Sequence, residues 1–207
     1  MSSVTVGLVF IVLLQFLYIL YLTYAEQYVE WRRLRKIKQF GDYGEKLVSD
    51  YLDNLEDVFG VYHGLQSRFD RKTFEIDHLL LTHQGIILIE TKNIRGKIVS
   101  KRDGWCQIKT SEKGKSYERD FKSPIAQVDR TKKIFEAMML DNGLKIETLP
   151  LVVFSNHDAD LQLGKERYPV LHLHELERHV DSLTAQVPLS TRQLREIQKL
   201  IDQSFNH

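Results

Sequence analysis

Two carboxylates and an ammonium group occur on a segment that is otherwise largely apolar. Residues 75–93 have the sequence Glu-Ile-Asp-His-Leu-Leu-Leu-Thr-His-Gln-Gly-Ile-Ile-Leu-Ile-Glu-Thr-Lys-Asn, which predicts two strands joined by a short turn. With a two-residue loop at His83–Gln84, Asp77 lies directly opposite Glu90, with the two Cβ atoms about 5 Å apart. Because side chains alternate along a strand, Lys92 projects from the same face as Glu90. A longer turn would make the two acids diagonal neighbours, still within reach of one cation.

Adjacent carboxylates repel each other, and burying either one without a partner is costly, so we expect a positive group between them. A hard divalent cation, Mg²⁺ or Mn²⁺, accepts oxygen ligands from two carboxylates, water and a substrate phosphate. The side chain of Lys92 would then orient or deprotonate an attacking water while the metal stabilises charge on the phosphate. The alternative is that Asp77 ends a strand, and that Glu90 and Lys92 form an exposed ion pair of little energetic value.

Positive charge is concentrated in the middle of the chain. The formal net charge is only +1, but residues 92–133 contain 13 Lys and Arg against 5 Asp and Glu. A basic region beside an acidic site suits the binding of a polyanion such as nucleic acid. A solvated basic surface without a ligand is the alternative. The single cysteine, Cys106, excludes an internal disulfide and suits a reducing compartment.

The first forty residues predict a membrane anchor followed by a basic linker. Residues 4–24 are apolar apart from a few polar or small residues, and a helix of this length spans the hydrocarbon layer of about 30 Å. Residues 31–38 then carry five positive charges and no acid. Because no Lys or Arg precedes the apolar segment, the positive-inside rule places the N-terminus outside and the rest in the cytoplasm. We therefore expect a single-pass protein of the cell inner membrane, with the anchor at residues 1–25 and the linker at residues 26–40. A cleaved signal peptide is the alternative, but the apolar run is long and lacks a preceding basic residue.

Two predicted helices would position further polar side chains. Residues 40–59 have apolar residues at helical spacing, and Glu45 lies at the edge of that stripe. It becomes a third site carboxylate if the helix packs against the hairpin, and is otherwise a boundary residue. Ser123 and Pro124 are typical of an N-cap and a first helical position. On the helix that follows, Gln127 faces inward, where it contacts a site water or is a satisfied core amide.

The rest of the pattern predicts strands, one long loop and two C-terminal helices. Strands are expected at residues 58–66, 74–81, 86–92, 98–100, 105–109, 149–154 and 168–173. Residues 109–122 are polar and charged and are expected to form a mobile loop, part of which contacts substrate. A short helix is expected at residues 174–183, and Ser190 with Gln193 forms a capping box for the last helix. The alternating histidines His172 and His174 are expected at the surface or at a helix cap, because no third ligand has matching spacing.

Five short segments occur in a specific order along the chain. They are Gly44-Glu45, Glu75-Ile76-Asp77-His78, Glu90-Thr91-Lys92-Asn93, Gly96-Lys97-Ile98 before Trp105, and Ser123-Pro124-Ile125-Ala126-Gln127. Together they resemble the core of the PD-(D/E)XK nucleases and, more closely, the nuclease-related domain (NERD), over about residues 41–155. The resemblance implies an α/β fold with a restriction-endonuclease-like core: a helix, a three-stranded antiparallel or mixed sheet, a helix and a strand. A transmembrane helix would precede this core, and residues 156–207 would pack on it.

The resemblance also implies roles for individual residues. Asp77 and Glu90 resemble metal ligands, and Lys92 resembles the catalytic lysine. Glu45 resembles an additional acidic residue of the metal site, and Gln127 an assisting residue near the scissile phosphate. The function expected is therefore a membrane-anchored, Mg²⁺-dependent nuclease acting on DNA. The alternative is a non-catalytic module of the same fold that binds nucleic acid or a protein partner at the membrane face.

Overall fold

The computed structural model describes the chain except for five short segments, residues 1–2, 102–103, 112–113, 186–187 and 206–207. The side chains of residues 3–10 and of residue 12 are also outside the description. The chain divides into two units, Met1–Asp42 and Tyr43–His207.

The first unit is helical. Its helix, α1 (Ser3–Leu52), continues into the second unit, so the residues of the expected basic linker, 26–40, are helical. The expected end of this helix near residue 59 is wrong, because a turn follows Leu52. Much of the first half of the expected anchor at residues 4–24 lies outside the described side chains. In the part of the chain that is described, no helix is both long enough and apolar enough to span a membrane.

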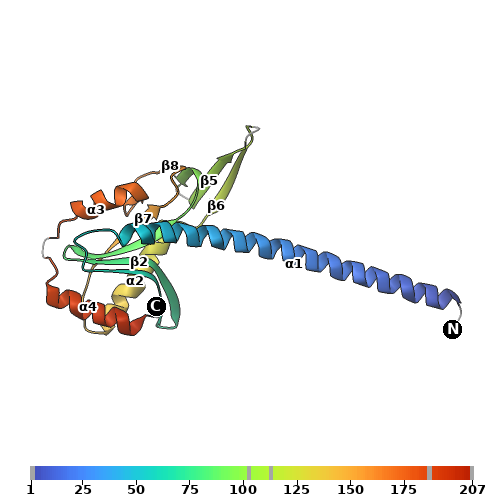
Figure 1. The fold of residues 1–207 in the computed structure, drawn as a ribbon, viewed down its shortest axis with the longest axis horizontal. Coiled ribbons are helices and arrows are strands. Elements are labelled where there is room, and N and C mark those ends of the chain that lie inside the picture. The colour runs from blue at the N-terminus through green and yellow to red at the C-terminus, as the bar shows by residue number, and fades with distance from the viewer. Residues whose placement is uncertain (1–2, 102–103, 112–113, 186–187, 206–207) are drawn as a thin grey trace. The chain divides into compact units, whose positions relative to one another are not determined.

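The larger sheet of the second unit contains five strands rather than the expected three (Figure 1). In spatial order they are β1 (Gly60–Phe69), β2 (Lys72–Thr82), β3 (Gly85–Lys92), β7 (Thr148–Phe154) and β9 (Val170–His172). The first three strands pair antiparallel, whereas β7 pairs parallel to β3, and β9 pairs parallel to β7. The sheet is therefore mixed, and its central strand is β3, the second strand of the predicted hairpin.

Helices cover both faces of this sheet, and the pattern on β3 shows why. Ile86 and Leu88 belong to a core that includes residues of α2 and α4, whereas Ile87 and Ile89 belong to a second core with α1 and α3. All four side chains are buried. A strand buried on both faces is a continuous apolar run rather than an alternating one. This packing fixes the end of β3, where the polar residues begin.

The helices of the second unit largely confirm the predicted caps. They are α2 (Pro124–Asp141), a 3₁₀ turn η1 (Leu173–Glu175), α3 (Leu176–Ser182) and α4 (Thr191–Ser204). The side chain of Ser123 accepts a hydrogen bond from the backbone N–H of Ala126 at 3.2 Å, as the predicted N-cap requires. Ser190 and Gln193 form the predicted capping box at the start of α4.

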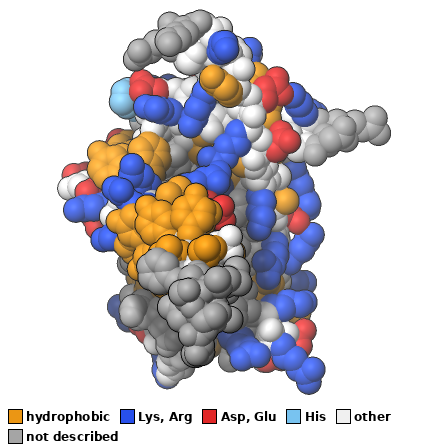
Figure 2. Space-filling model, turned by 90° about the vertical axis from the view of Figure 1, so that its right-hand side faces the viewer, with side chains coloured by type: hydrophobic (Ala, Val, Ile, Leu, Met, Phe, Trp, Pro, Cys, Tyr) orange, Lys and Arg blue, Asp and Glu red, His pale blue; other side chains and the backbone are white. Residues whose placement is uncertain are grey.

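A second, four-stranded sheet has the order β6-β5-β4-β8. Its strands are β4 (Gly96–Lys101), β5 (Gly104–Thr110), β6 (Ser116–Phe121) and β8 (Ala159–Gln162). The prediction of a loop over residues 109–122 is wrong, because β6 pairs antiparallel with β5 over its whole length. We call the β5–β6 hairpin the arm, since it projects from the rest of the second unit in Figure 1. In Figure 2, Lys and Arg side chains cover much of one side of the face shown.

Candidate functional site

The hairpin of β2 and β3 has the predicted register. The two-residue loop is present, and the last pair of the ladder is His78–Ile89, which leaves Asp77 and Glu90 as the next residues to face each other. At this point the backbone N–H of Thr91 donates a hydrogen bond to Asp77 Oδ2 at 2.7 Å. Where the two strands separate, the N–H of Thr91 thus bonds to the carboxylate of Asp77 instead of to a main-chain carbonyl of β2. This hydrogen bond holds the carboxylate beside β3.

Glu90 and Lys92 project from the same face of β3, as predicted. The Nζ atom of Lys92 lies 2.6 Å from Oε1 of Glu90, and the two side chains are only 20% and 11% exposed. The pair is therefore not the exposed ion pair of the alternative interpretation. A largely buried, charge-assisted contact of this length fixes both side chains in one arrangement.

Burial raises the pKa of both carboxyl groups, and neighbouring carboxylates add to each shift, Asp77 to that of Glu90 and Glu75 to that of Asp77. Burial is the larger cause for Glu90, followed by the charge of Asp77, and together they raise its pKa to about 7 although Lys92 acts in the opposite direction. Burial also raises the pKa of Asp77, although the hydrogen bond from Thr91 opposes the shift. The charge of Glu45 raises the pKa of Glu90 further. Each negative charge at this site is thus held at a cost that a bound cation would offset.

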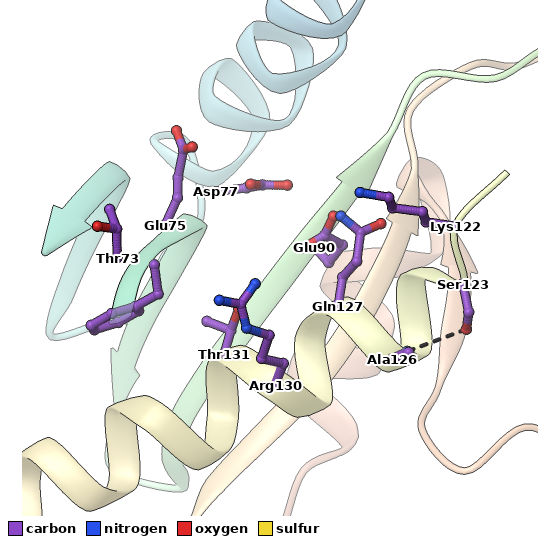
Figure 3. A pocket seen from close by; sticks show the side chains of 11 residues that line it. Thr73, Glu75, Asp77, Glu90, Lys122, Ser123, Ala126, Gln127, Arg130 and Thr131 are labelled. Carbon is purple, nitrogen blue, oxygen red and sulfur yellow. Dashed lines mark hydrogen bonds between the residues drawn. The ribbon is translucent and has the colours of Figure 1, made fainter. Parts of the chain in front are cut away.

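The two carboxylates line a pocket of about 570 Å³. Figure 3 shows Asp77 and Glu90 on the strands of the hairpin, with Gln127 and Arg130 reaching toward them from α2. Lys122, just before α2, also lines the pocket. The inward orientation predicted for Gln127 is confirmed, and its half-buried side chain lines the pocket rather than the core. The pocket thus combines an acidic wall with a rim that carries two cations.

Glu45 reaches this end of the sheet because α1 approaches it closely at Gly44. A Cβ atom on Gly44 would overlap the side chain of Asn93 and lie 2.8 Å from Oγ of Ser155. So close an approach requires a residue without a Cβ atom at this position. Among the described residues, however, no group of three or more His, Cys, Asp or Glu side chains could hold a metal ion. A role for Glu45 as a third ligand therefore stays a prediction, and His172 and His174, whose rings stack at 5.4 Å, likewise form no such group.

The donor set formed by Asp77 and Glu90 fits a hard divalent cation. Mg²⁺ is commonly bound by one or two carboxylates, keeps several waters and takes its remaining ligands from substrate phosphates. Two neighbouring carboxylates whose pKa values are raised by burial and by nearby negative charge match that requirement without a third acid. Sulfur ligands, which would favour a softer metal, are absent from the described lining of the pocket.

Sequence reasoning missed a polar pair beside Lys92 at the end of β7. The backbone N–H of Ser155 donates to the carbonyl of Lys92 at 3.0 Å, and Nδ2 of Asn156 donates to Oδ1 of Asn93 at 2.9 Å. Both residues directly follow β7, which pairs parallel to β3, so their carboxyl ends meet at one edge of the sheet. The sequence does show two polar residues directly after an apolar strand. They can be assigned to the site only once β7 is known to pair parallel to β3.

Comparison with known proteins gives one match. A family model described as the nuclease-related domain (NERD) matches residues 40–155, which is more than half of the chain and contains every predicted site residue. No curated protein matches the chain, and no solved structure does.

Proposed function

Because this chain belongs to the nuclease-related domain (NERD) family, we propose that it is a metal-dependent nuclease that hydrolyses phosphodiester bonds in DNA. The observation that carries the proposal is the 2.6 Å contact between Lys92 and Glu90, beside Asp77, at a pocket with a basic rim. Carboxyl groups whose pKa values are shifted by burial and by a neighbouring charge, and which line a cavity, are candidates for a functional site.

Each polar residue of the site has a place in this proposal. Asp77 and Glu90 would hold Mg²⁺ or Mn²⁺, which supplies Lewis-acid chemistry when bound. The ammonium of Lys92 would donate a hydrogen bond that orients the attacking water and would stabilise negative charge on the phosphate. The amide of Gln127 would bind a non-bridging phosphate oxygen. Glu45 would assist from the end of α1.

The basic residues of the rim would hold the substrate. Lys122 and Arg130 line the pocket with the two carboxylates, so phosphates on either side of the scissile bond can contact them. Binding by such side chains releases counterions and weakens steeply as salt is raised. The same positive charge offsets the repulsion between a polyanion and an acidic site.

We expect Asp77→Asn to reduce metal-dependent cleavage by about 100-fold or more, the scale found when a charge-stabilising group is removed. Asparagine keeps an oxygen that can accept the hydrogen bond from Thr91, so the fold is retained. The measurement is nicking of supercoiled DNA, and degradation of a matched RNA, by the full-length protein with Mg²⁺, Mn²⁺ or EDTA. Asp50→Asn, at an exposed position of α1, is the matched control.

Two outcomes would contradict the proposal. Wild-type activity in Asp77→Asn would remove the catalytic assignment of the site. Metal-independent binding of DNA without cleavage would favour the second candidate, a non-catalytic module of the same fold, in which the basic rim formed by Lys122 and Arg130 would bind the strand without cutting it.

We also propose that residues 4–24 anchor the protein in the cell inner membrane, with the nuclease domain in the cytoplasm. The support is the apolar composition of this segment and the five positive charges at residues 31–38. We expect the full-length protein to remain in the membrane fraction after alkaline extraction. The double substitution Leu13→Lys and Leu17→Lys should release it, since each mid-segment lysine disfavours insertion by about 3 kcal/mol, whereas Leu34→Lys should not. Recovery of the wild type in the supernatant would contradict this proposal.

A further inference from the structure

One face of the arm changes from buried aromatic residues at its base to exposed basic and aromatic residues toward its tip. At the base, Trp105 is paired with Phe121, their rings lie 6.0 Å apart, and Trp105 also stacks on Phe154. Side chains of every second residue share a face of a strand. The same face therefore carries Arg119 and Tyr117 farther along β6, where neither has a core to pack against.

The side chain of Tyr117 is 59% exposed, which is more than any other tyrosine, tryptophan or phenylalanine side chain described in the second unit. The ladder places Lys109 of β5 directly across from it, and Arg119 is its neighbour two residues along the same face. Lys109 and Arg119 are both exposed. An exposed tyrosine between two cations presents a flat π-surface flanked by positive charge.

The acidic residues of β6 lie on the opposite face of the arm. Glu118 alternates with Tyr117 and Arg119 along β6, and it forms an ion pair with Lys101 at 3.4 Å. Asp120 shares that opposite face. Neither Lys109 nor Arg119 forms an ion pair with any residue that the structure describes. The tyrosine face is thus positively charged, and its cations are available to an anionic partner.

The arm leads directly to the proposed site. Phe121 ends β6, and the next two residues, Lys122 and Ser123, line the pocket that contains Asp77. At a rise of about 3.3 Å per residue, Tyr117 lies about 13 Å along the strand from Phe121. A nucleic-acid strand of several nucleotides that enters the pocket can therefore extend along the arm to Tyr117.

We propose that the Tyr117 face of the arm binds an unpaired segment of the nucleic-acid strand whose phosphate enters the pocket. Tyr117 stacks on one base, and Lys109 and Arg119 bind the neighbouring phosphates. Bases within a duplex are already stacked on both sides, so a single tyrosine platform selects unpaired nucleotides. The inference rests on the proposed nuclease function and specifies its substrate as a strand with a single-stranded segment beside the cleavage site.

The positive charge at the pocket agrees with this path. Lys122 and Arg130 line the pocket to which the arm leads. A phosphate chain that leaves the arm for the pocket therefore meets further cations there. A protein partner would gain less from this face, because two flanking lysine or arginine side chains around one tyrosine leave little apolar area to bury.

The test is binding of a fluorescent 20-nucleotide single strand and of the matched duplex to the full-length protein in EDTA, measured by anisotropy. We expect Tyr117→Ala to weaken single-strand binding roughly tenfold, as loss of one base stack does, and to leave duplex binding unchanged. Tyr117→Phe should bind like the wild type. Arg119→Ala should lower the slope of log K against log salt by about 0.7 for the single strand. Tyr43→Ala, at an equally exposed tyrosine of α1, is the control.

Unchanged single-strand binding by Tyr117→Ala, or equal weakening for strand and duplex, would overturn the inference. Circular dichroism of each variant distinguishes a loss of binding from unfolding. Substitution of an exposed side chain is not expected to unfold the protein. Cleavage is scored separately with Mg²⁺. Tyr117-dependent binding by a protein that cuts nothing would support the inference and remove the nuclease proposal, whereas cleavage without Tyr117-dependent binding would do the reverse.

Discussion

Lys92→Met is expected to reduce DNA cleavage by the full-length protein at least 100-fold, within the range for loss of a positioned proton-transfer or charge-stabilising group. Methionine is similar in length to the aliphatic part of lysine but carries no charge and donates no hydrogen bond. The variant therefore loses the ammonium that contacts Glu90 at 2.6 Å and keeps most of the packing. The measurement is the rate of cleavage with saturating Mg²⁺, with thermal denaturation of the same sample.

The stability of this variant separates a catalytic from a structural role for Lys92. Removing one partner of a buried ion pair costs about 3–5 kcal/mol when the other charge stays unpaired. Glu90 can avoid most of that cost by binding a proton, because burial and the neighbouring Asp77 already raise its pKa to about 7. We therefore expect a smaller loss of stability, which the double variant Lys92→Met with Glu90→Gln should recover without recovering cleavage.

The matched control is Lys46→Met, at an exposed position of α1, which should cleave like the wild type. Recovery of cleavage in the double variant would mean that neither Lys92 nor the charge of Glu90 takes part in catalysis, and that the pair only supports the fold. Wild-type cleavage by Lys92→Met alone would exclude it as the catalytic lysine and would leave the role of Asp77 to its own test.

Two features of the fold that depend only on neighbouring residues, the register of β2 with β3 and the N-cap of α2, were predicted from the sequence. The register of β2 and β3 depends on a two-residue loop and on two apolar runs, and both signals lie within one short segment. The cap of α2 depends on Ser123 and Pro124 alone. By contrast, β6 has the sequence Ser-Tyr-Glu-Arg-Asp-Phe, which shows neither the apolar alternation of a half-buried strand nor the apolar spacing of a helix. It becomes a strand because β5 pairs with it, and this pairing depends on tertiary context.

The same division holds for the site. Asp77, Glu90 and Lys92 belong to one hairpin, so their approach follows from strand alternation. The distance of Gln127 from the two carboxylates depends on how α2 packs on the sheet. The apolar face of α2 predicted that Gln127 points inward, but not which residues it lies beside. The polar pair after β7 requires the parallel pairing of β7 with β3, a contact between residues about 60 positions apart that no local pattern specifies.

Gly44→Ala is expected to lower the melting temperature by roughly 5–10 °C, because overpacking of a close contact costs about 1–3 kcal/mol in a domain of this size. The new methyl group would overlap the side chain of Asn93 and approach Oγ of Ser155 to 2.8 Å. Ser155 is only 7% exposed and follows a strand of the central sheet, so it cannot move aside freely. The measurement is thermal denaturation of the full-length protein followed by circular dichroism.

Gly41→Ala is the matched control, and its expected effect has the opposite sign. Gly41 lies on the same helix with nothing within 4 Å of its Cβ position, and alanine in place of glycine inside a helix stabilises it by about 0.5–1 kcal/mol. A helix propensity effect alone would stabilise both variants, so loss of stability only in Gly44→Ala identifies the contact with the sheet as the cause. Equal stability of the two variants would show that α1 does not approach the sheet this closely. Cleavage should fall with stability in Gly44→Ala, since displacing this turn also displaces Glu45, whose charge acts on Glu90.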